Sequence, residues 1–163
     1  MPQVYLSLGS NIDREQSIRR GVEQLAEQFG VLEISTVYES AAVGFEGDAF
    51  YNLVVGFQSE CPWEQIQQQL RQIEEENGRA RGSEKFAPRT LDIDLLIYGE
   101  LDLQSQGIDL PRAEIFKYAF VLRPLAEIAP EACHPQTGES YHQLWQQFDA
   151  EQQPLWPAPL QFH

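Results

Sequence analysis

The sequence predicts an α+β fold: a ferredoxin-like antiparallel sheet with helices packed on it, on one face, as a single domain over residues 1–163. Segments with strand and helix periodicity follow one another in the approximate order βαββαβ, with helical additions after them. The 163 residues, of which 42% are hydrophobic, suit one domain with one core. No internal repeat or linker divides them.

The first strand and helix are indicated by the spacing of their apolar residues. Alternating side chains at Val4, Leu6 and Leu8 predict a half-buried strand that stops at the turn 9–11. The helix that follows has one apolar face, and Gly30 is typical of its C-terminal end. That face comprises Ile18, Val22, Leu25, Ala26 and Phe29.

Two further strands are predicted over residues 31–39 and 50–57, which are rich in β-branched and aromatic residues. The loop between them, 40–48, contains two glycines. A second helix begins near Pro62, a residue suited to the first helical position, and ends at 77–78. Its inner face consists of Trp63, Ile66, Leu70 and Ile73.

The second half of the chain is predicted to contain a strand over 90–98 with a hairpin partner near 101–103. A third helix is expected over about 118–128, where Pro124 interrupts or starts it. A short helix around 141–148 is also expected, and the proline-rich tail after it is expected to be irregular.

Composition excludes several classes of function. The formal net charge of −14 disfavours a nucleic-acid partner, because an acidic surface repels phosphate backbones. No apolar run approaches the roughly 20 residues that span a bilayer, so we expect no membrane partner. The N-terminus does not resemble a signal peptide. Cys61 and Cys133 form no CxxC pair, which favours a reducing, cytoplasmic location over a disulfide framework.

Basic residues cluster in the polar loop 78–89, which holds four of the eleven: Arg79, Arg81, Lys85 and Arg89. A cationic patch on an acidic protein favours a small polyanion as ligand, and arginines can hold phosphates with paired hydrogen bonds. A solvated basic loop explains the charge alone equally well. Because the loop is long, polar and flanked by glycine, we expect a lid that is mobile without ligands and ordered with them.

The strand predicted over 90–98 has an apolar and an acidic face. Four apolar residues are expected to be buried together: Leu91, Ile93, Leu95 and Ile97. Asp92 and Asp94 lie on the other face, about 6.5–7 Å apart along the strand. Neighbouring carboxylates repel each other, and a hard divalent cation such as Mg²⁺ removes that cost. Two ordinary surface acids are the alternative, but aspartate is disfavoured in strands, which favours the metal.

The acids and the arginine-rich loop together indicate a phosphoryl-transfer site. The sequence has no GxxxxGK[ST] motif, so the site is not a P-loop. His134 and His142 lack partners at zinc spacing, and we expect both to be packing or surface residues. No serine or cysteine nucleophile motif is present.

Several motifs together carry a resemblance to a known family. The most specific is Pro-Arg-Thr-Leu-Asp-Ile-Asp-Leu-Leu over residues 88–96, and the others cover 8–11, 35–40 with 44–45, 50–52, 78–81 and 120–130. On these motifs most of the chain resembles the 6-hydroxymethyl-7,8-dihydropterin pyrophosphokinases of the folate pathway. The resemblance implies an enzyme in which the pterin hydroxymethyl oxygen attacks the β-phosphorus of ATP and AMP leaves.

The resemblance also implies roles for single residues. Asp92 and Asp94 match the ligands of two Mg²⁺ ions. Arg79 and Arg89 match catalytic residues that steady the transferring phosphates, and Phe86 matches an aromatic lid residue. The ATP-contacting positions are matched by Glu74, Arg81 and Leu95. The pterin pocket is matched by Ser40, Ala41, Ala42, Val43, Asn52 and Phe120, of which Asn52 would bond the ring edge and Phe120 would stack.

The sequence departs from the family pattern in three places. Arg112 follows Pro111 where members usually have a histidine that contacts ATP, and its guanidinium can contact phosphate or adenine instead. Tyr118 stands where a basic residue usually faces the triphosphate, although Lys117 is adjacent. Residues 41–42 replace one or two prolines of the pterin loop. We therefore expect poorer ATP binding than in a typical member.

Three functions remain open at this point. A working pterin pyrophosphokinase is favoured over a binding or regulatory paralog and over an enzyme that acts on another heterocycle. The intact acid pair favours an enzyme, because a non-catalytic paralog has no reason to keep two repelling acids on one strand face. ATP and a pterin alcohol are the expected partners of a protein that we expect to be a monomer.

Overall fold

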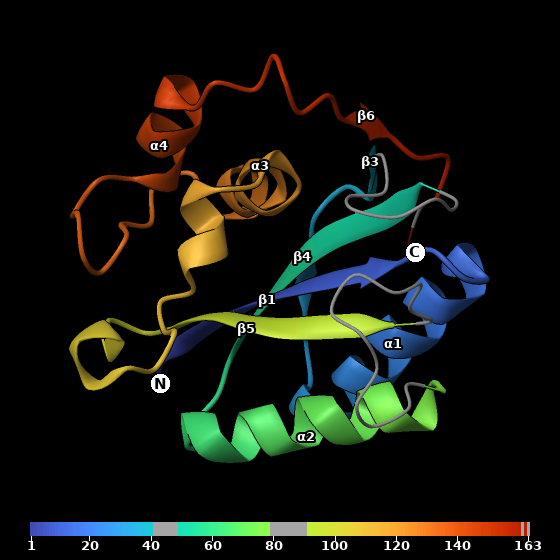
Figure 1. The fold of residues 1–163 in the computed structure, drawn as a ribbon. Coiled ribbons are helices and arrows are strands. Elements are labelled where there is room, and N and C mark those ends of the chain that lie inside the picture. Colours follow the sequence, from blue (N-terminus) through green and yellow to red (C-terminus); the bar gives the residue numbers. More distant parts are fainter. Residues whose placement is uncertain (41–48, 79–90, 161, 163) are drawn as a thin grey trace.

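A computed structural model describes residues 1–40, 49–78, 91–160 and 162. The chain order of its elements is easily followed by colour (Figure 1). The elements are β1 (Gln3–Ser10), α1 (Arg14–Phe29), β2 (Glu33–Ile34), β3 (Tyr38–Ser40), β4 (Phe50–Gln58), α2 (Trp63–Glu76), β5 (Asp92–Tyr98), the 3-10 helices η1 (Gln104–Gln106) and η2 (Ala113–Phe116), α3 (Ala119–Ile128), α4 (Tyr141–Gln147) and β6 (Trp156–Pro157).

The strands form one antiparallel sheet in the order β5-β1-β4-β3-β6, and β2 also pairs with β4. In this order the strands of the first βαβ unit, β1 and β3, alternate with those of the second, β4 and β5. This is the ferredoxin-like arrangement, so the predicted fold class is confirmed. The single strand expected over 31–39 is two short ones. The Ser35 hydroxyl accepts the N–H of Val54 at 2.9 Å in place of a backbone carbonyl, which interrupts the ladder between β2 and β3.

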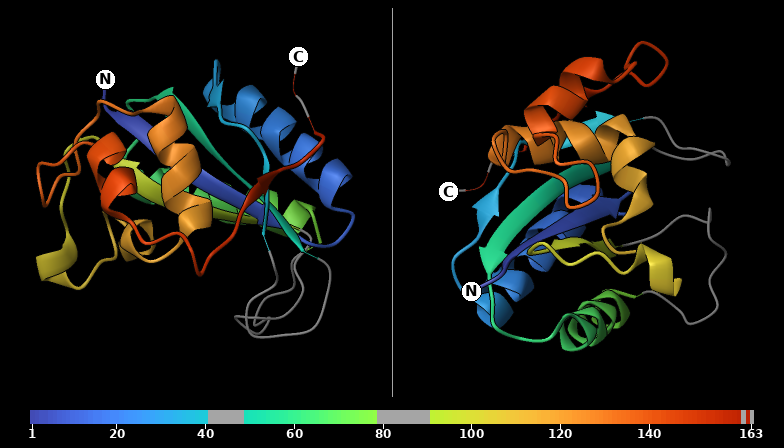
Figure 2. Two further views of the ribbon diagram at one scale, coloured as in Figure 1. Left: turned by 90° about the horizontal axis from the view of Figure 1, so that it is seen from above. Right: turned by 90° about the vertical axis from the view of Figure 1, so that its left-hand side faces the viewer.

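Helices cover both faces of the sheet (Figures 1 and 2). The prediction that they pack on one face only was wrong. One apolar cluster, the α1–α2 core, includes Leu6, Leu8, Leu53, Ile18, Leu25, Ile66 and Leu70. A second, the α3–α4 core, includes Tyr5, Val54, Leu96, Ile97, Val121, Leu122, Leu125, Tyr141 and Leu144. The second face needs its own helices because its strand residues are also apolar. No helix in the described ranges is both long and apolar enough to cross a membrane.

A β-bulge in β5 changes which face its last residues occupy. The register with β1 shifts between Tyr5 and Leu6, so Leu96 is an extra residue in β5. Leu95 belongs to the α1–α2 core, whereas Leu96 and Ile97 belong to the α3–α4 core. The expectation that Ile97 shares the face of Leu95 was therefore wrong, because strict alternation fails at a bulge.

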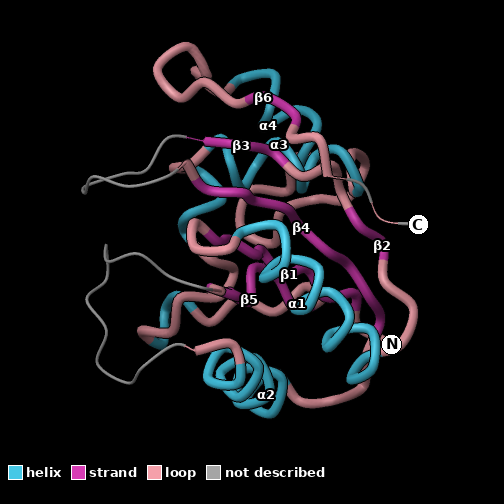
Figure 3. The backbone as a smooth tube through the Cα atoms, turned by 90° about the vertical axis from the view of Figure 1, so that its right-hand side faces the viewer, coloured by secondary structure: helices cyan, strands magenta, loops and turns pink. Residues whose placement is uncertain are grey.

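Three further expectations differ from the structure. Residues 101–103 form no hairpin strand; the Leu103 N–H instead bonds the Leu110 carbonyl at 2.7 Å and closes a loop around η1. Pro124 neither interrupts nor starts α3 but lies buried inside it. The tail is ordered where β6 pairs with β3 along the edge of the sheet, as Figure 3 shows.

Candidate functional site

Asp92 and Asp94 project from β5 toward the α3–α4 side of the sheet. Ile93 and Leu95 alternate with them and are buried in the α1–α2 core, so the two acids share the opposite face as predicted. Both aspartates are half-buried, and in β1 they lie opposite Gly9 and Ser7. The strand thus presents two carboxylates side by side at the edge of the sheet.

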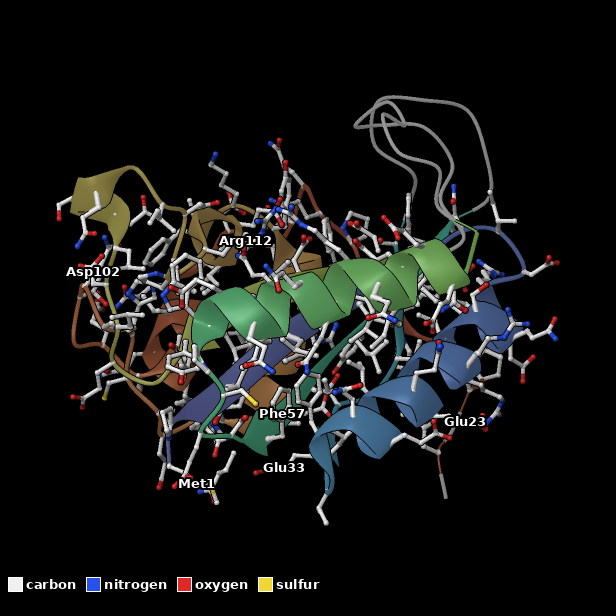
Figure 4. All side chains as sticks on the ribbon, turned by 90° about the horizontal axis from the view of Figure 1, so that it is seen from below. Met1, Glu23, Glu33, Phe57, Asp102 and Arg112 are labelled. Atoms are coloured by element: carbon white, nitrogen blue, oxygen red, sulfur yellow. The ribbon has the colours of Figure 1, made fainter. Side chains whose placement is uncertain are left out.

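Arg112 is a charged partner that the structure places beside Asp94. Its Nη2 lies 3.6 Å from Asp94 Oδ1 and 3.2 Å from Glu114 Oε1, and its Nη1 lies 3.9 Å from Asp109 Oδ2. The backbone N–H of Arg112 bonds the Leu96 carbonyl at 2.9 Å, which fixes the segment before η2 along β5. Arg112 is labelled in Figure 4, where the molecule is seen from below.

The surroundings of Arg112 are acidic. Burial alone would lower the pKa of Arg112, but the carboxylates of Asp94, Glu114 and Asp109 outweigh it and raise that pKa. The guanidinium is therefore always charged here, and among the described residues three carboxylates, those of Asp94, Asp109 and Glu114, lie close to it. A site of this composition attracts a divalent cation and can hold a phosphate oxygen at the same time.

A polar row crosses the sheet at the level of Asp92. The register places Asp92 opposite Gly9, Gly9 opposite Asn52 and Asn52 opposite Tyr38, on four adjacent strands. Since neighbouring strands lie about 4.8 Å apart, Asp92 and Asn52 are separated by roughly 10 Å. Gly9 keeps the space between them open, because a Cβ there would lie 3.1 Å from Asn52 Oδ1.

Asn52, which is on this row, forms a buried polar pair with Ser40, two residues beyond Tyr38 in β3. Asn52 Nδ2 donates to Ser40 Oγ at 2.7 Å, and both side chains are buried. This bond fixes the amide so that Asn52 Oδ1 faces the space above Gly9. A buried amide held in this way can recognise a donor on a flat heterocycle.

The N-terminal end of α3 supplies aromatic rings above the same face. Phe120 is half-buried, and Tyr118 stacks on it with ring centroids 4.8 Å apart and planes at 15°. The helix is tied to β3 through Glu127, which accepts hydrogen bonds of 2.8 Å from both the Tyr38 hydroxyl and the Thr36 hydroxyl. Burial, reinforced by Glu127, raises the pKa of Tyr38 and keeps it a hydrogen-bond donor.

Glu74 and Leu95 lie apart from the acidic face. Glu74 is buried and accepts the N–H of Ile93 at 2.8 Å, so it supports the edge of β5. The Leu95 side chain is in the α1–α2 core. Any contact between Leu95 and a ligand on the acidic face would have to use its backbone.

Several expected site residues fall outside the described ranges, namely Arg79, Arg81, Phe86, Arg89, Ala41, Ala42 and Val43. Within those ranges no three His, Cys, Asp or Glu side chains gather into a metal cluster. Mg²⁺ typically takes only one or two carboxylates and completes its shell with water and phosphate, so the Asp92–Asp94 pair fits its needs. The predictions for the two histidines are confirmed: His134 is buried among aromatic rings and His142 is exposed.

A hollow of about 690 Å³ lies elsewhere, along the start of α1. Its lining consists of Asp13, Arg14, Glu15, Gln16, Arg19, Arg20, Glu23 and Tyr51. Neither aspartate of β5 is among its lining residues, and its charged side chains are mixed in sign, so the polar row stays the candidate site. Sequence reasoning missed Arg14, which lines this hollow, and its ion-pair partner Glu39; their opposite charges, 25 residues apart, give no local signal.

The comparisons with known proteins fit this geometry. The model of the 7,8-dihydro-6-hydroxymethylpterin-pyrophosphokinase (HPPK) family matches residues 5–130. The chain belongs to this family. It is 36% identical over 137 residues to the 2-amino-4-hydroxy-6-hydroxymethyldihydropteridine pyrophosphokinase of Aquifex aeolicus, covering 83% of this chain and 85% of that one. The Bacillus subtilis protein of the same name is 33% identical over 151 residues, covering 88% of this chain and 90% of that one.

Longer proteins share the same region. The folic acid synthesis protein fol1 of Pneumocystis carinii is 36% identical over 140 residues, which are 84% of this chain but 19% of that protein. The crystal structure of Plasmodium falciparum HPPK-DHPS wild type with SDX-DHP matches with a TM-score of 0.65 and 14% identity, over 90% of this chain and 44% of that one. This chain spans less than half of that structure, and the likeness supports the fold alone.

Proposed function

We propose that this protein transfers diphosphate from ATP to 6-hydroxymethyl-7,8-dihydropterin and releases AMP, a step of folate biosynthesis. Membership of the pyrophosphokinase family supports the reaction class. The observation that carries the proposal is the polar row across the sheet. It sets two carboxylates suited to Mg²⁺ and phosphate about two strands away from a buried amide suited to a pterin edge.

The two ends of the row bind different parts of the reactants: the end at Asp92 binds metal and phosphate, and the end at Asn52 binds the pterin. Asp92 and Asp94 would hold Mg²⁺ together with the phosphates of ATP, and the family resemblance implies two ions. Bound Mg²⁺ neutralises charge on the transferring group. Arg112 donates to a phosphate oxygen beside Asp94. We assign Arg79 and Arg89 to the same phosphates, and Glu74, Arg81 and Leu95 to ATP, on the resemblance alone.

The pterin end orients the nucleophile. Asn52, held by Ser40, bonds the ring edge through its amide, while Phe120 stacks on the ring. Ala41, Ala42 and Val43 complete the pocket and Phe86 the lid on the resemblance. The transfer needs no covalent nucleophile from the protein. Most of the rate enhancement therefore comes from charge stabilisation and from holding the hydroxymethyl group in line with the β-phosphorus.

The first test is release of AMP from Mg·ATP with and without 6-hydroxymethyl-7,8-dihydropterin. We expect pterin-dependent AMP in the native protein. Asp92→Asn and Asp94→Asn should each lower kcat roughly 100-fold or more, because a metal ligand at a phosphoryl-transfer site contributes several kcal/mol. Glu100→Gln removes an exposed acid just after the same strand and is the matched control.

Two results would contradict the proposal. If the variant with both Asp92→Asn and Asp94→Asn had the kcat of the native protein, the assignment of these residues as metal ligands would be wrong. Calorimetric binding of the pterin without any AMP release would instead identify a binding paralog.

A further inference from the structure

Arg14 joins three segments of the chain through one guanidinium. Its Nη1 donates to Glu39 Oε1 at 2.9 Å and to the Ala49 carbonyl at 2.8 Å. The guanidinium also lies over the Tyr51 ring, 4.0 Å from the centroid. Glu39 is near the end of β3, and Ala49 immediately precedes β4, so one side chain spans the ends of two neighbouring strands.

The start of α1 is built to present Arg14 in this direction. The hydroxyls of Ser10 and Ser17 both donate to the Ile12 carbonyl, at 3.2 and 2.9 Å, and fix the turn between β1 and α1. Asp13 adopts a left-handed backbone with φ of 45°, which aspartate tolerates better than most residues. This turn begins directly after Gly9, the glycine of the polar row.

Glu39 is held from a second side by the C-terminal tail. Its Oε2 accepts the indole N–H of Trp156 at 2.9 Å, and Trp156 pairs with Glu39 in the β3–β6 ladder. Both carboxylate oxygens thus have a donor. A carboxylate held by a guanidinium and an indole is confined more tightly than one in an ordinary surface ion pair.

Arg14, Glu39 and Trp156, called the clamp from here on, lie on one face of the sheet at the ends of β3 and β4. The residues proposed to bind the pterin lie on the other face. Glu39 pairs with Tyr51 across β3 and β4, and the next residue of each strand, Ser40 and Asn52, points to the other face. Ser40 and Asn52 bond each other there at 2.7 Å. A change in the spacing of the two strand ends therefore alters the Asn52 amide without any contact between Arg14 and a ligand.

We propose that Arg14 is a positioning residue for the pterin: with Glu39 and Trp156 it fixes the ends of β3 and β4, and so the Ser40–Asn52 pair that recognises the ring. The inference rests on the proposed function, which it deepens by a residue far from the acids. It assigns a specific effect, on pterin affinity rather than on ATP.

The test is steady-state kinetics and direct pterin binding on Arg14→Met, which keeps the side-chain stem and removes the donors. We expect the KM and Kd for 6-hydroxymethyl-7,8-dihydropterin to rise roughly tenfold, since small misplacements of binding groups cost about this much or more. The KM for ATP should change less than twofold. Arg19→Gln, five residues along the same helix in an exposed pair with Glu15, is the matched control and should leave both constants unchanged.

Graded variants guard against a general loss of folding. Arg14→Lys offers a single point charge and should recover part of the pterin affinity. Trp156→Phe removes only the indole donor to Glu39 and should raise the pterin KM by a smaller factor. In the double variant Arg14→Met with Glu39→Gln, the effects on pterin Kd should fall short of additivity, because both changes break one contact.

The outcomes separate this inference from the proposed function. An active native protein whose pterin KM is unchanged in Arg14→Met and Trp156→Phe would overturn the clamp alone. Equal increases in the KM for ATP and for pterin would do the same, because they indicate a general structural role. A native protein that neither binds nor converts the pterin would overturn the proposed function and this inference together.

Discussion

Single side chains decide how the acidic face of β5 is used. Asp94 has Arg112 within 3.6 Å, and the same guanidinium contacts Glu114. The family resemblance implies a histidine in place of Arg112, and the sequence left open where this arginine points; in the structure it points to the acids. A permanent cation there would compete with the proposed metal for Asp94 and would also offer a hydrogen-bond donor to the phosphates of ATP.

We predict that Arg112→Gln raises the KM for ATP roughly tenfold and lowers kcat less. A charge-assisted hydrogen bond contributes about 1.5–3 kcal/mol, and this one serves the bound nucleotide more than the transferring group. Initial rates at varied ATP provide the measurement. Arg112→Lys should give an intermediate KM, and an unchanged KM in both variants would limit Arg112 to holding Asp94 and Glu114.

Tyr118 is the second residue whose role depends on its surroundings. The family resemblance implies a basic residue at this position, whereas here the Tyr118 ring stacks on Phe120. We predict that Tyr118→Arg lowers the KM for ATP, because a cation is returned near the triphosphate, with little change in kcat. The same variant should weaken pterin binding through loss of the stacked ring.

Tyr118→Phe is the control for this prediction, because it keeps the stack and adds no charge. Its KM values for both substrates should stay near native. If Tyr118→Arg leaves the KM for ATP unchanged, the side chain at position 118 does not face the nucleotide.

At the scale of elements, short helices here depend on their ends. The helix α4 has seven residues, too few to be stable by propensity. Its Ser140 forms a capping box: the hydroxyl accepts the Gln143 N–H at 3.1 Å, and the Gln143 side chain accepts the Ser140 N–H at 3.0 Å. Tyr141 and Leu144 then bury one face of the helix in the α3–α4 core, where α4 packs mainly against α3.

We predict that Ser140→Ala lowers the free energy of unfolding by about 1 kcal/mol, the usual value of a lost N-cap. Urea denaturation at neutral pH measures it. His142→Ala, an exposed change in the same helix, should have less than half that effect. Equal losses in the two variants would show that the cap contributes nothing specific.

At the scale of the whole molecule, a buried histidine links η2 with the start of α4. His134 lies in the chain segment between α3 and α4, and its ring centroid is 4.5 Å from that of Phe116 and 6.2 Å from that of Tyr141. Its Nδ1 accepts the Gln136 N–H at 3.1 Å, and its Nε2 is buried without a partner in the described part of the chain. Burial lowers the pKa of His134 from its usual 6.5, and the charge of Asp102 opposes that shift only in part.

This lowered pKa predicts a pH dependence of stability. Below about pH 6.5 the unfolded chain binds a proton that the folded chain excludes, so acid favours unfolding. The free energy of unfolding should therefore rise from pH 5.5 to pH 7 with a contribution from His134 of at most about 1.4 kcal/mol per pH unit. Urea denaturation across this range should show a shallower slope for His134→Gln, while the exposed His142→Gln keeps the native slope.

Much of the fold follows from local patterns. The spacing of Ile66, Leu70 and Ile73 predicts α2, and the structure ends it within a residue or two of the expected 77–78. Patterns failed where the backbone departs from its repeat, as at the bulge of Leu96, or where a side chain replaces a ladder bond, as Ser35 does between β2 and β3. Neither feature has a periodic signature.

The sequence by itself determined that Asp92 and Asp94 share one strand face, because side-chain alternation is a property of neighbouring residues. The family motifs, too, are local. Only the tertiary structure decided that Gly9 lies between Asp92 and Asn52, that Arg112 turns toward Asp94, and that Arg14 clamps the ends of β3 and β4. The residues in these contacts are far apart in the sequence, from 18 positions for Arg112 and Asp94 to 83 positions for Asp92 and Gly9. Strand register and the packing of both cores select such contacts, and those depend on the whole chain at once.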